Sequence, residues 1–159
     1  MFPSLLIFCL LCFAAASTGA IFKPGAWYKG LAKPSWTPPN WVFPVVWTIL
    51  FAMMAIAGWR VWKAAGVEAW PSLALFVLHL GVNAAWSYLF FGRRRLDWAM
   101  VDVLTLAAMV AVLTLSFLCV DEIAALLLVP YLAWVCLAAT LNFRVLQMNG
   151  PRGEGRTAT

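Results

Sequence analysis

Charged residues are scarce in this chain. They make up 11% of its 159 residues, whereas an ordinary soluble domain carries about 25%. Hydrophobic residues make up 65%, and the mean hydropathy is +0.90. This composition excludes an ordinary soluble domain and predicts an integral membrane protein. It also excludes a nucleic-acid-binding protein, because the net charge of +5 has no soluble module on which a basic face could form.

The chain also has few of the residues that catalysis and metal binding need. It has a single histidine, His79, and four cysteines. It has no serine in a nucleophile elbow, no carboxylates paired at a useful spacing and no glycine loop that could hold a phosphate. Cys9 and Cys12 imitate a C-x-x-C motif, but they stand in an apolar run without a second pair of ligands. We therefore predict no catalytic residues, no metal site and no required cofactor, and binding is favoured over catalysis.

Long apolar runs take the place of the missing charge. A helix needs about 20 apolar residues to cross the hydrocarbon core, and five runs are long enough. Because the runs are apolar on both parities, they predict helices and not the alternating strands of a β-barrel. The expected fold is an all-α membrane protein, a five-transmembrane-helix bundle with a Trp/Pro-rich loop between helices 1 and 2. One domain covers residues 1–148, a flexible tail covers 149–159, and the spans are 2–22, 42–62, 71–91, 98–120 and 123–146.

The first run has a second interpretation as a secretory signal, because the small residues Ala14 to Ser17 resemble a cleavage region. No basic residue precedes the run and it is long enough to span, so a membrane helix is favoured. The connections after the second, third and fourth spans are short. Short connections predict that consecutive helices pack side by side and antiparallel.

Lysine and arginine fall mostly on one side of the predicted spans. Only Arg60 and Lys63 lie on the other side. The positive-inside rule therefore predicts that the Trp/Pro loop and the C-terminus face the cytoplasm. The residues on the predicted cytoplasmic side are Lys23, Lys29, Lys33, Arg93, Arg94, Arg95, Arg144, Arg152 and Arg156.

The loop between the first two spans is rich in tryptophan and proline. The stretch Lys33 to Trp47 holds Trp36, Trp41 and Trp47 together with four prolines. Proline fixes φ and removes a backbone donor, so the segment is predicted to be a stiff loop without regular helix through Pro39. Indole has a flat apolar face and one N–H donor, which suits either a flat aromatic ligand or the membrane interface. We interpret the loop as an ordered lid over one mouth of the bundle.

Two stripes of aromatic and polar residues mark candidate pocket walls. At helical spacing one face of the third span carries His79, Asn83, Trp86 and Phe90, and one face of the fifth carries Tyr131, Trp134, Ala138 and Leu141. The structural alternatives stay open: Asn83 as a bond between helices, His79 as a core residue and the second stripe as an aromatic core. Asp102 is expected to be paired or neutral. Gly81 and Ala85 form a small pair opposite Asn83 that could contact another helix or a second protomer.

Four motifs carry a resemblance to a known family. They are W-Y-x-x-L-x-K-P-S-W-x-P-P-x-W-V-F-P-x-V-W, L-x-x-N-x-x-W-x-x-x-F-F-G, W-A-x-V-D and P-Y-L-A-W-x-x-x-A-x-x-L-N, over residues 27–47, 80–92, 98–102 and 130–142. With these four motifs in this order, the chain resembles the TspO/MBR family of translocator proteins, tryptophan-rich sensory proteins and peripheral-type benzodiazepine receptors.

The resemblance implies a five-helix bundle, usually a homodimer, in a bilayer, here expected in a bacterial cell envelope. It implies porphyrin or heme as ligand, protoporphyrin IX above all, and in animal members cholesterol and isoquinoline or benzodiazepine drugs. An enzyme-like alternative is light-dependent porphyrin breakdown through Trp36, Trp47 and Trp134. The pocket positions that match the family are Trp36, Trp47, Asn83, Trp86, Trp98, Trp134, Ala138 and Leu141.

Two positions depart from the family pattern. Phe143 stands where the cholesterol-recognition segment of animal members has a tyrosine, which disfavours a sterol as the natural ligand. Ala74 and Leu78 stand where some members have the glycine pair of a dimer contact. The sequence therefore predicts a tetrapyrrole-binding membrane protein that acts in transport, sensing or regulation.

Overall fold

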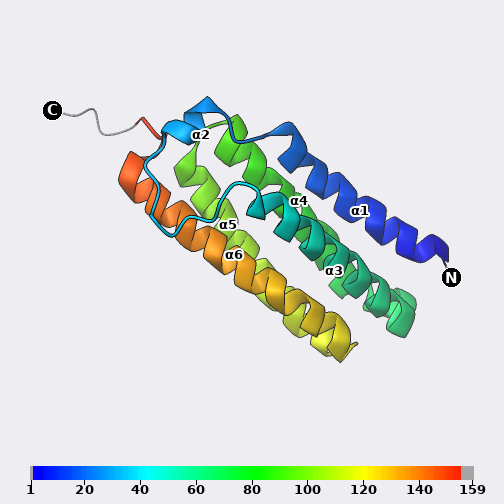
Figure 1. Ribbon diagram of the computed structural model, residues 1–159. Coiled ribbons are helices and arrows are strands. Elements are labelled where there is room, and N and C mark those ends of the chain that lie inside the picture. The colour runs from blue at the N-terminus through cyan, green and yellow to red at the C-terminus, as the bar shows by residue number, and fades with distance from the viewer. Residues whose placement is uncertain (1, 155–159) are drawn as a thin grey trace.

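The computed structural model describes residues 2–154, and this part of the chain is helical without a strand (Figure 1). Five long helices are joined by a loop that contains one short helix, by two helical turns and by tight links. The elements are α1 (Phe2–Ile21), α2 (Ala26–Gly30), α3 (Val42–Ala65), the 3-10 turn η1 (Gly66–Ala69), α4 (Trp70–Ser87), the π turn η2 (Tyr88–Gly92), α5 (Leu96–Leu118) and α6 (Glu122–Asn149).

Within residues 2–154, four helical runs are long and apolar enough to cross a membrane. They are Pro3–Ile21, Val42–Gly92, Leu96–Leu118 and Glu122–Asn149. The second run has 51 residues and contains both α3 and α4. A straight helix of that length would measure roughly 75 Å, more than twice the hydrocarbon thickness of about 30 Å. The chain reverses at Gly66, whose φ of 53° lies in the left-handed region that glycine tolerates, so the run makes two passes.

The five long helices close into a ring. α1 packs against α3 and α4, α3 packs against α6, and α5 fills the gap between α6 and α4. The expectation that all consecutive helices are neighbours therefore fails for one pair. α3 and α4 make little contact beyond η1, because α1 packs against both of them.

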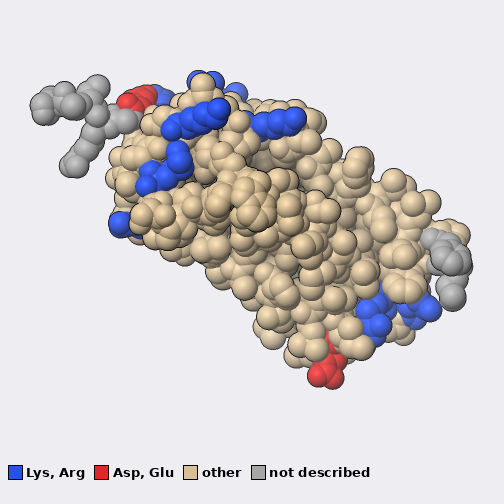
Figure 2. Space-filling model, in the orientation of Figure 1, with Lys and Arg blue, Asp and Glu red and all other residues tan. Residues whose placement is uncertain are grey.

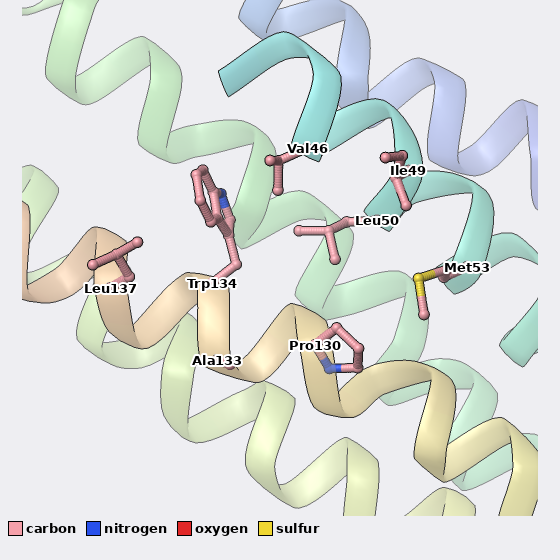
Figure 3. A pocket seen from close by; sticks show the side chains of 8 residues that line it. All are labelled: Val46, Ile49, Leu50, Met53, Pro130, Ala133, Trp134 and Leu137. Carbon is pink, nitrogen blue, oxygen red and sulfur yellow. The ribbon is translucent and has the colours of Figure 1, made fainter. Parts of the chain in front are cut away.

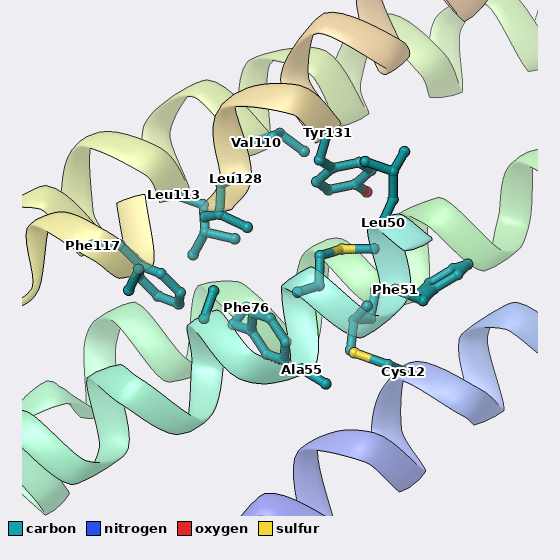
Figure 4. Close-up of a cluster of buried hydrophobic side chains, with 14 of the residues drawn as sticks. Cys12, Leu50, Phe51, Ala55, Phe76, Val110, Leu113, Phe117, Leu128 and Tyr131 are labelled. Atoms are coloured by element: carbon teal, nitrogen blue, oxygen red, sulfur yellow. The ribbon is translucent and has the colours of Figure 1, made fainter. Parts of the chain in front are cut away.

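The interior of the ring is an apolar core (Figure 4). α5 shows how the sequence sets it, since one stripe at helical spacing is almost fully buried: Leu96, Ala99, Val103, Leu106, Val110, Leu113 and Phe117. The opposite face is also apolar, with Val101, Leu104, Val112 and Leu115 exposed. A helix that is apolar all round needs an apolar medium outside the bundle, as a bilayer provides. Figure 2 agrees, since lysine and arginine colour only the two ends of the face shown.

The segment between α1 and α3 is ordered by its own hydrogen bonds. It holds the short helix α2, which ends before the Trp/Pro-rich stretch begins at Lys33. Lys33 closes the end of α2 because its Nζ donates to the carbonyls of Tyr28 at 2.7 Å and Leu31 at 2.9 Å. Burial lowers the pKa of this ammonium. The proline-rich part then runs in turns, with Thr37 N donating to Pro34 O at 3.1 Å.

The predicted tail begins with residues that are bonded to the rest of the protein. The side chain of Asn149 accepts from Ala32 N and donates to Ala32 O, both at 2.8 Å. Pro151 O accepts from the backbone N–H of Leu96 at 2.8 Å. Residues 155–159 of the predicted flexible tail lie outside the described residues.

An ion pair fixes the end of the bundle opposite the loop. Arg60 Nε and Nη2 donate to the two carboxylate oxygens of Asp121 at 3.0 and 2.8 Å. Asp121 also caps α6 by accepting from Ala124 N at 2.7 Å. The hydrogen bonds from Arg60, assisted by the Ala124 N–H, hold the pKa of Asp121 below its ordinary value of 3.8. The pair joins α3 to the turn between α5 and α6.

This lowered pKa predicts a loss of stability in acid. A carboxylate whose folded pKa is depressed stabilises the fold above its unfolded pKa and ceases to do so as the pH falls through the folded value. We expect the melting temperature in detergent to fall as the pH is lowered below about 4, and Asp121→Asn to remove part of that dependence. Because Arg60 is about one-third exposed, the effect should stay below about 1 kcal/mol. Identical pH profiles for the two proteins would contradict the assignment.

Candidate functional site

A buried hydrogen bond lies at the centre of the first candidate wall. Asn83 Nδ2 donates to Tyr131 Oη at 2.9 Å, and both side chains are buried. The indole of Trp47 lies edge-on to the Tyr131 ring, with centroids 6.1 Å apart, and the rings of Trp47 and Phe51 are 5.6 Å apart. The structure thus brings together three of the predicted site residues, from α3, α4 and α6.

A second cluster lies closer to the loop, where α4 ends. The rings of Trp86 and Phe90 are 4.8 Å apart, and Trp86 Nε1 donates to Asn142 Oδ1 at 3.2 Å. Asn142 Nδ2 in turn donates to the carbonyl of Leu96 at 3.0 Å. Phe90 stands in the π turn η2, and such turns are frequent at functional sites.

The predicted stripe on α6 runs along both clusters. Tyr131 is fully buried in the first, and Trp134 and Ala138 are half-buried against the same core. Leu141 belongs to the second cluster, with Phe90. The indole of Trp134 lies 5.7 Å from the ring of Phe43, the second residue of α3.

Two predicted contacts lie outside these clusters. Trp36 is 46% exposed in the loop and Trp98 is 55% exposed in the first turn of α5. Trp98 follows Leu96 by two residues, or about 200°, so it lies away from the buried face of α5. Contact of these two indoles with an interior ligand remains a prediction.

Several polar atoms in the core have no hydrogen-bond partner among the described residues. They include His79 Nε2, Trp134 Nε1 and Asp102 Oδ2. His79 is fully buried, its Nδ1 pairs with the carbonyl of Phe76, and its ring lies 5.7 Å from that of Tyr131. An unpaired buried polar group costs about 1–3 kcal/mol. An apolar interior with a few such groups is typical of a small-molecule site.

A groove lies on the outer side of the ring between α3 and α6 (Figure 3). Its volume is about 430 Å³, within the range of roughly 300–1,000 Å³ for ligand clefts. Trp134 is the one predicted site residue in its wall, and the indole stands between the two helices. The lining residues are Val46, Ile49, Leu50, Met53, Pro130, Ala133, Trp134 and Leu137.

Sequence reasoning missed two residues of the site. Phe43 lies in the aromatic loop motif and was not predicted as a site residue, although its ring contacts the Trp134 indole. Asn142 joins α4, α5 and α6 through its two hydrogen bonds. The sequence feature that could have identified it is an amide side chain within an apolar span. Within residues 2–154 the structure holds no group of three or more metal-ligating side chains.

A ring of five apolar helices with charge at its two ends and an aromatic interior defines an integral membrane protein of the helical-bundle class. The sequence profile of the TspO/MBR family matches residues 8–148, and the chain belongs to this family.

The relatives include proteins from bacteria, an archaeon and animals. The chain is 41% identical to protein CrtK of Rhodobacter capsulatus, covering 90% of this chain and 91% of CrtK. It is 40% identical to the tryptophan-rich sensory protein of Cereibacter sphaeroides, covering 95% and 94%. It is 42% identical to the translocator protein of Homo sapiens, covering 82% and 79%.

Proposed function

We propose that this protein binds tetrapyrroles, such as protoporphyrin IX and heme, in the interior of the helix ring and acts in their transport, sensing or regulation. The observation that carries the proposal is the aromatic interior around the Asn83–Tyr131 bond, beside which Trp134 Nε1 and His79 Nε2 have no hydrogen-bond partner within residues 2–154. Relatives named translocator protein and tryptophan-rich sensory protein support a role in transport or sensing.

The chemistry of a porphyrin suits this interior. A porphyrin is a flat aromatic ring that indole and phenyl faces can stack against, with nitrogen atoms inside and carboxylates at the edge. Its propionates could reach basic side chains at the loop end. Lys29 and Arg93 are exposed there, whereas Lys33 already holds the carbonyls of Tyr28 and Leu31. Lys29 and Arg93 are therefore favoured over Lys33 as propionate contacts.

Removing two indoles tests the proposal. We expect Trp47→Ala with Trp134→Ala to weaken protoporphyrin IX binding roughly tenfold, because each aromatic contact contributes about 0.5–1.5 kcal/mol beyond its buried area. The measurement is the shift of the porphyrin absorption band on titration in detergent micelles. Trp70→Ala is the matched control, since Trp70 is 69% exposed where α4 begins, at the opposite end of the bundle from the loop. Unchanged affinity in the double variant would refute the interior site.

A second candidate function is light-dependent breakdown of the bound porphyrin. Trp47 contacts Tyr131, and Trp134 follows Tyr131 by three residues on the same face of α6, so both indoles flank one site. Absorbance spectra of the complex in light and in darkness separate the two functions. Tight binding without a light-dependent product would rule out the breakdown and leave binding as the function.

We also propose that the protein forms a homodimer through the outer face of α4. Asn83 is buried and Gly81 is exposed, and a Cβ built at Gly81 meets no atom within 4 Å. Leu78, one turn away, is 64% exposed. Close approach of small residues stabilises helix pairs in membranes. Gly81→Leu should shift the protein to monomer in light scattering with detergent correction, and an unchanged mass would place the interface elsewhere.

The positive-inside rule supports an orientation with the Trp/Pro loop and the C-terminus in the cytoplasm. Lysine and arginine are denser at the loop end of the face in Figure 2 than at the opposite end. Membrane-impermeant amine reagents should therefore label Lys63 and spare Lys29 in intact bacterial cells. Labelling of Lys29 alone would reverse the orientation.

A further inference from the structure

Basic residues gather where α1 ends beside the π turn η2. The ring of Phe22 lies 5.3 Å from that of Tyr88, and a Cβ built at Gly92 would lie 2.9 Å from Phe22 Cδ1. Lys23 follows Phe22 in the chain, and Arg93 follows Gly92. Both basic side chains are exposed, and they start from the two sides of one packing contact.

Arg94 extends this cluster and is also exposed. Its guanidinium lies over the ring of Trp27, 5.9 Å from the centroid, and a stacked guanidinium keeps its N–H edge for an anion. Arg95 differs, because it donates to both carboxylate oxygens of Asp97 at 2.9 and 2.6 Å. Glu154 is exposed at the same end of the bundle, and within residues 2–154 no carboxylate forms an ion pair with the cluster. We call the three exposed side chains the basic surface: Lys23, Arg93 and Arg94.

An apolar face adjoins the basic surface. Ile21, the last residue of α1, is 70% exposed, and Tyr88, the first residue of η2, is 42% exposed. No charged residue precedes Lys23 in the chain, so charge begins where the apolar helix ends. Tyrosine is enriched at the membrane interface. The basic surface therefore lies at the level of the lipid headgroups, at the loop end where lysine and arginine gather in Figure 2.

We propose that the basic surface binds the headgroup of an anionic phospholipid, whose acyl chains lie along the apolar face beside Ile21 and Tyr88. The phosphate accepts charge-assisted hydrogen bonds from Lys23, Arg93 and Arg94. Phosphatidylcholine fits less well, because its choline adds a positive charge to three others. A free anion also fits less well, because it leaves the apolar face uncovered. The site needs no tetrapyrrole, although a propionate at Arg93 would compete for the same guanidinium.

The first test measures lipid binding to the delipidated full chain by native mass spectrometry from detergent micelles, with no porphyrin present. Dioleoylphosphatidylglycerol and dioleoylphosphatidylcholine carry the same acyl chains and are titrated separately. We expect the phosphatidylglycerol to bind roughly tenfold more tightly, because basic residues near a membrane surface attract anionic lipids. Equal affinity for the two lipids would overturn the proposal. Displacement of the phosphatidylglycerol by an equal concentration of glycerol 1-phosphate would overturn it too, since the acyl chains would then contribute nothing.

Two charge-matched variants separate this site from diffuse surface charge. Lys23→Gln should weaken phosphatidylglycerol binding roughly fivefold. Arg144→Gln removes the same charge from an exposed side chain near the end of α6, which packs on α3 and α5 across the ring from α1, and should leave the binding unchanged. Equal losses in the two variants would overturn the proposal.

The position of the lipid is tested on the unaltered protein. Phosphatidylglycerol with a diazirine in one acyl chain should label residues 19–22 and 87–92 on irradiation, located by mass spectrometry. Label spread evenly around the bundle would overturn the proposal. Labelling at these segments by a protein that binds no porphyrin would keep the lipid site and refute the tetrapyrrole function.

Discussion

Replacing Asn142 with leucine is expected to lower the free energy of unfolding by about 2 kcal/mol, because the substitution leaves two buried groups without partners. Trp86 Nε1 loses its acceptor and the Leu96 carbonyl loses the N–H of the amide. Asn142 is 1% exposed, so water cannot replace the amide. Leucine has the same number of side-chain heavy atoms and the same branching at Cγ, so the change removes the hydrogen bonds without leaving a cavity.

The measurement is unfolding in mixed micelles of dodecylmaltoside and sodium dodecyl sulfate, followed by circular dichroism. Thr140→Val is the matched control, since Thr140 is exposed on the same helix and its hydroxyl bonds only the carbonyl of Cys136 in its own helix. The control should unfold within about 0.5 kcal/mol of the original protein. If both variants unfold alike, Asn142 does not join the three helices energetically.

Because Trp86 belongs to the predicted site, the same variant also concerns binding. Without its acceptor the indole is free to change rotamer, and it lies 4.8 Å from Phe90 and 5.8 Å from Phe91. We therefore expect Asn142→Leu to weaken porphyrin binding indirectly, through the changed position of the Trp86 indole. Asn142→Asp keeps the acceptor for Trp86 and should preserve more of the binding.

The five long helices begin and end within a few residues of the apolar runs in the sequence, because the length of such a run depends on local composition. The buried stripe of α5 likewise follows from helical spacing. The ring order was harder to predict. A short turn at Gly66 suggested that α3 and α4 lie side by side, yet both pack on α1, since ring order depends on which apolar faces fit together.

The candidate site was predicted where polarity contrasted with its surroundings. Asn83 stood out in an apolar span, and the structure places it against Tyr131. The partners that Asn142 and Asn149 bind outside α6 lie 46 to 117 residues away, so no spacing rule could pair them. The π turn at Tyr88–Gly92 also has no sequence signal in helical periodicity, because it arises where α4 must end against α5. The groove beside Trp134 depends on the distance between two helices, which composition does not set.

Replacing Asn149 with alanine is expected to release the loop from the end of α6. Its side chain makes hydrogen bonds to Ala32 N and Ala32 O and also donates to the carbonyl of Val145 at 2.8 Å. One side chain thus pairs with both backbone groups of Ala32, which joins the loop to the end of α6. Without them the Ala32 amide should exchange with solvent at least tenfold faster, which corresponds to a loss of about 1.4 kcal/mol.

A second variant tests the same junction without touching Asn149. Gly153 has a φ of 62°, and a Cβ there would lie 2.8 Å from both Leu31 Cδ2 and Trp27 Cζ2. Gly153→Val should therefore push the segment after α6 away from α2 and also accelerate exchange at Ala32. Gln147→Ala, which changes an exposed side chain on α6, should leave exchange unchanged.

Loop release should also change access to the interior. Trypsin cleaves after exposed lysines, so Asn149→Ala should be cut faster after Lys29, whose side chain is exposed beside the junction in α2. If the loop is the lid of the tetrapyrrole site, the same variant should exchange bound protoporphyrin IX faster while the aromatic interior stays intact. Faster cleavage with unchanged porphyrin exchange would show that the ligand reaches the interior by another route, and the wall between α3 and α6 would then be the place to look.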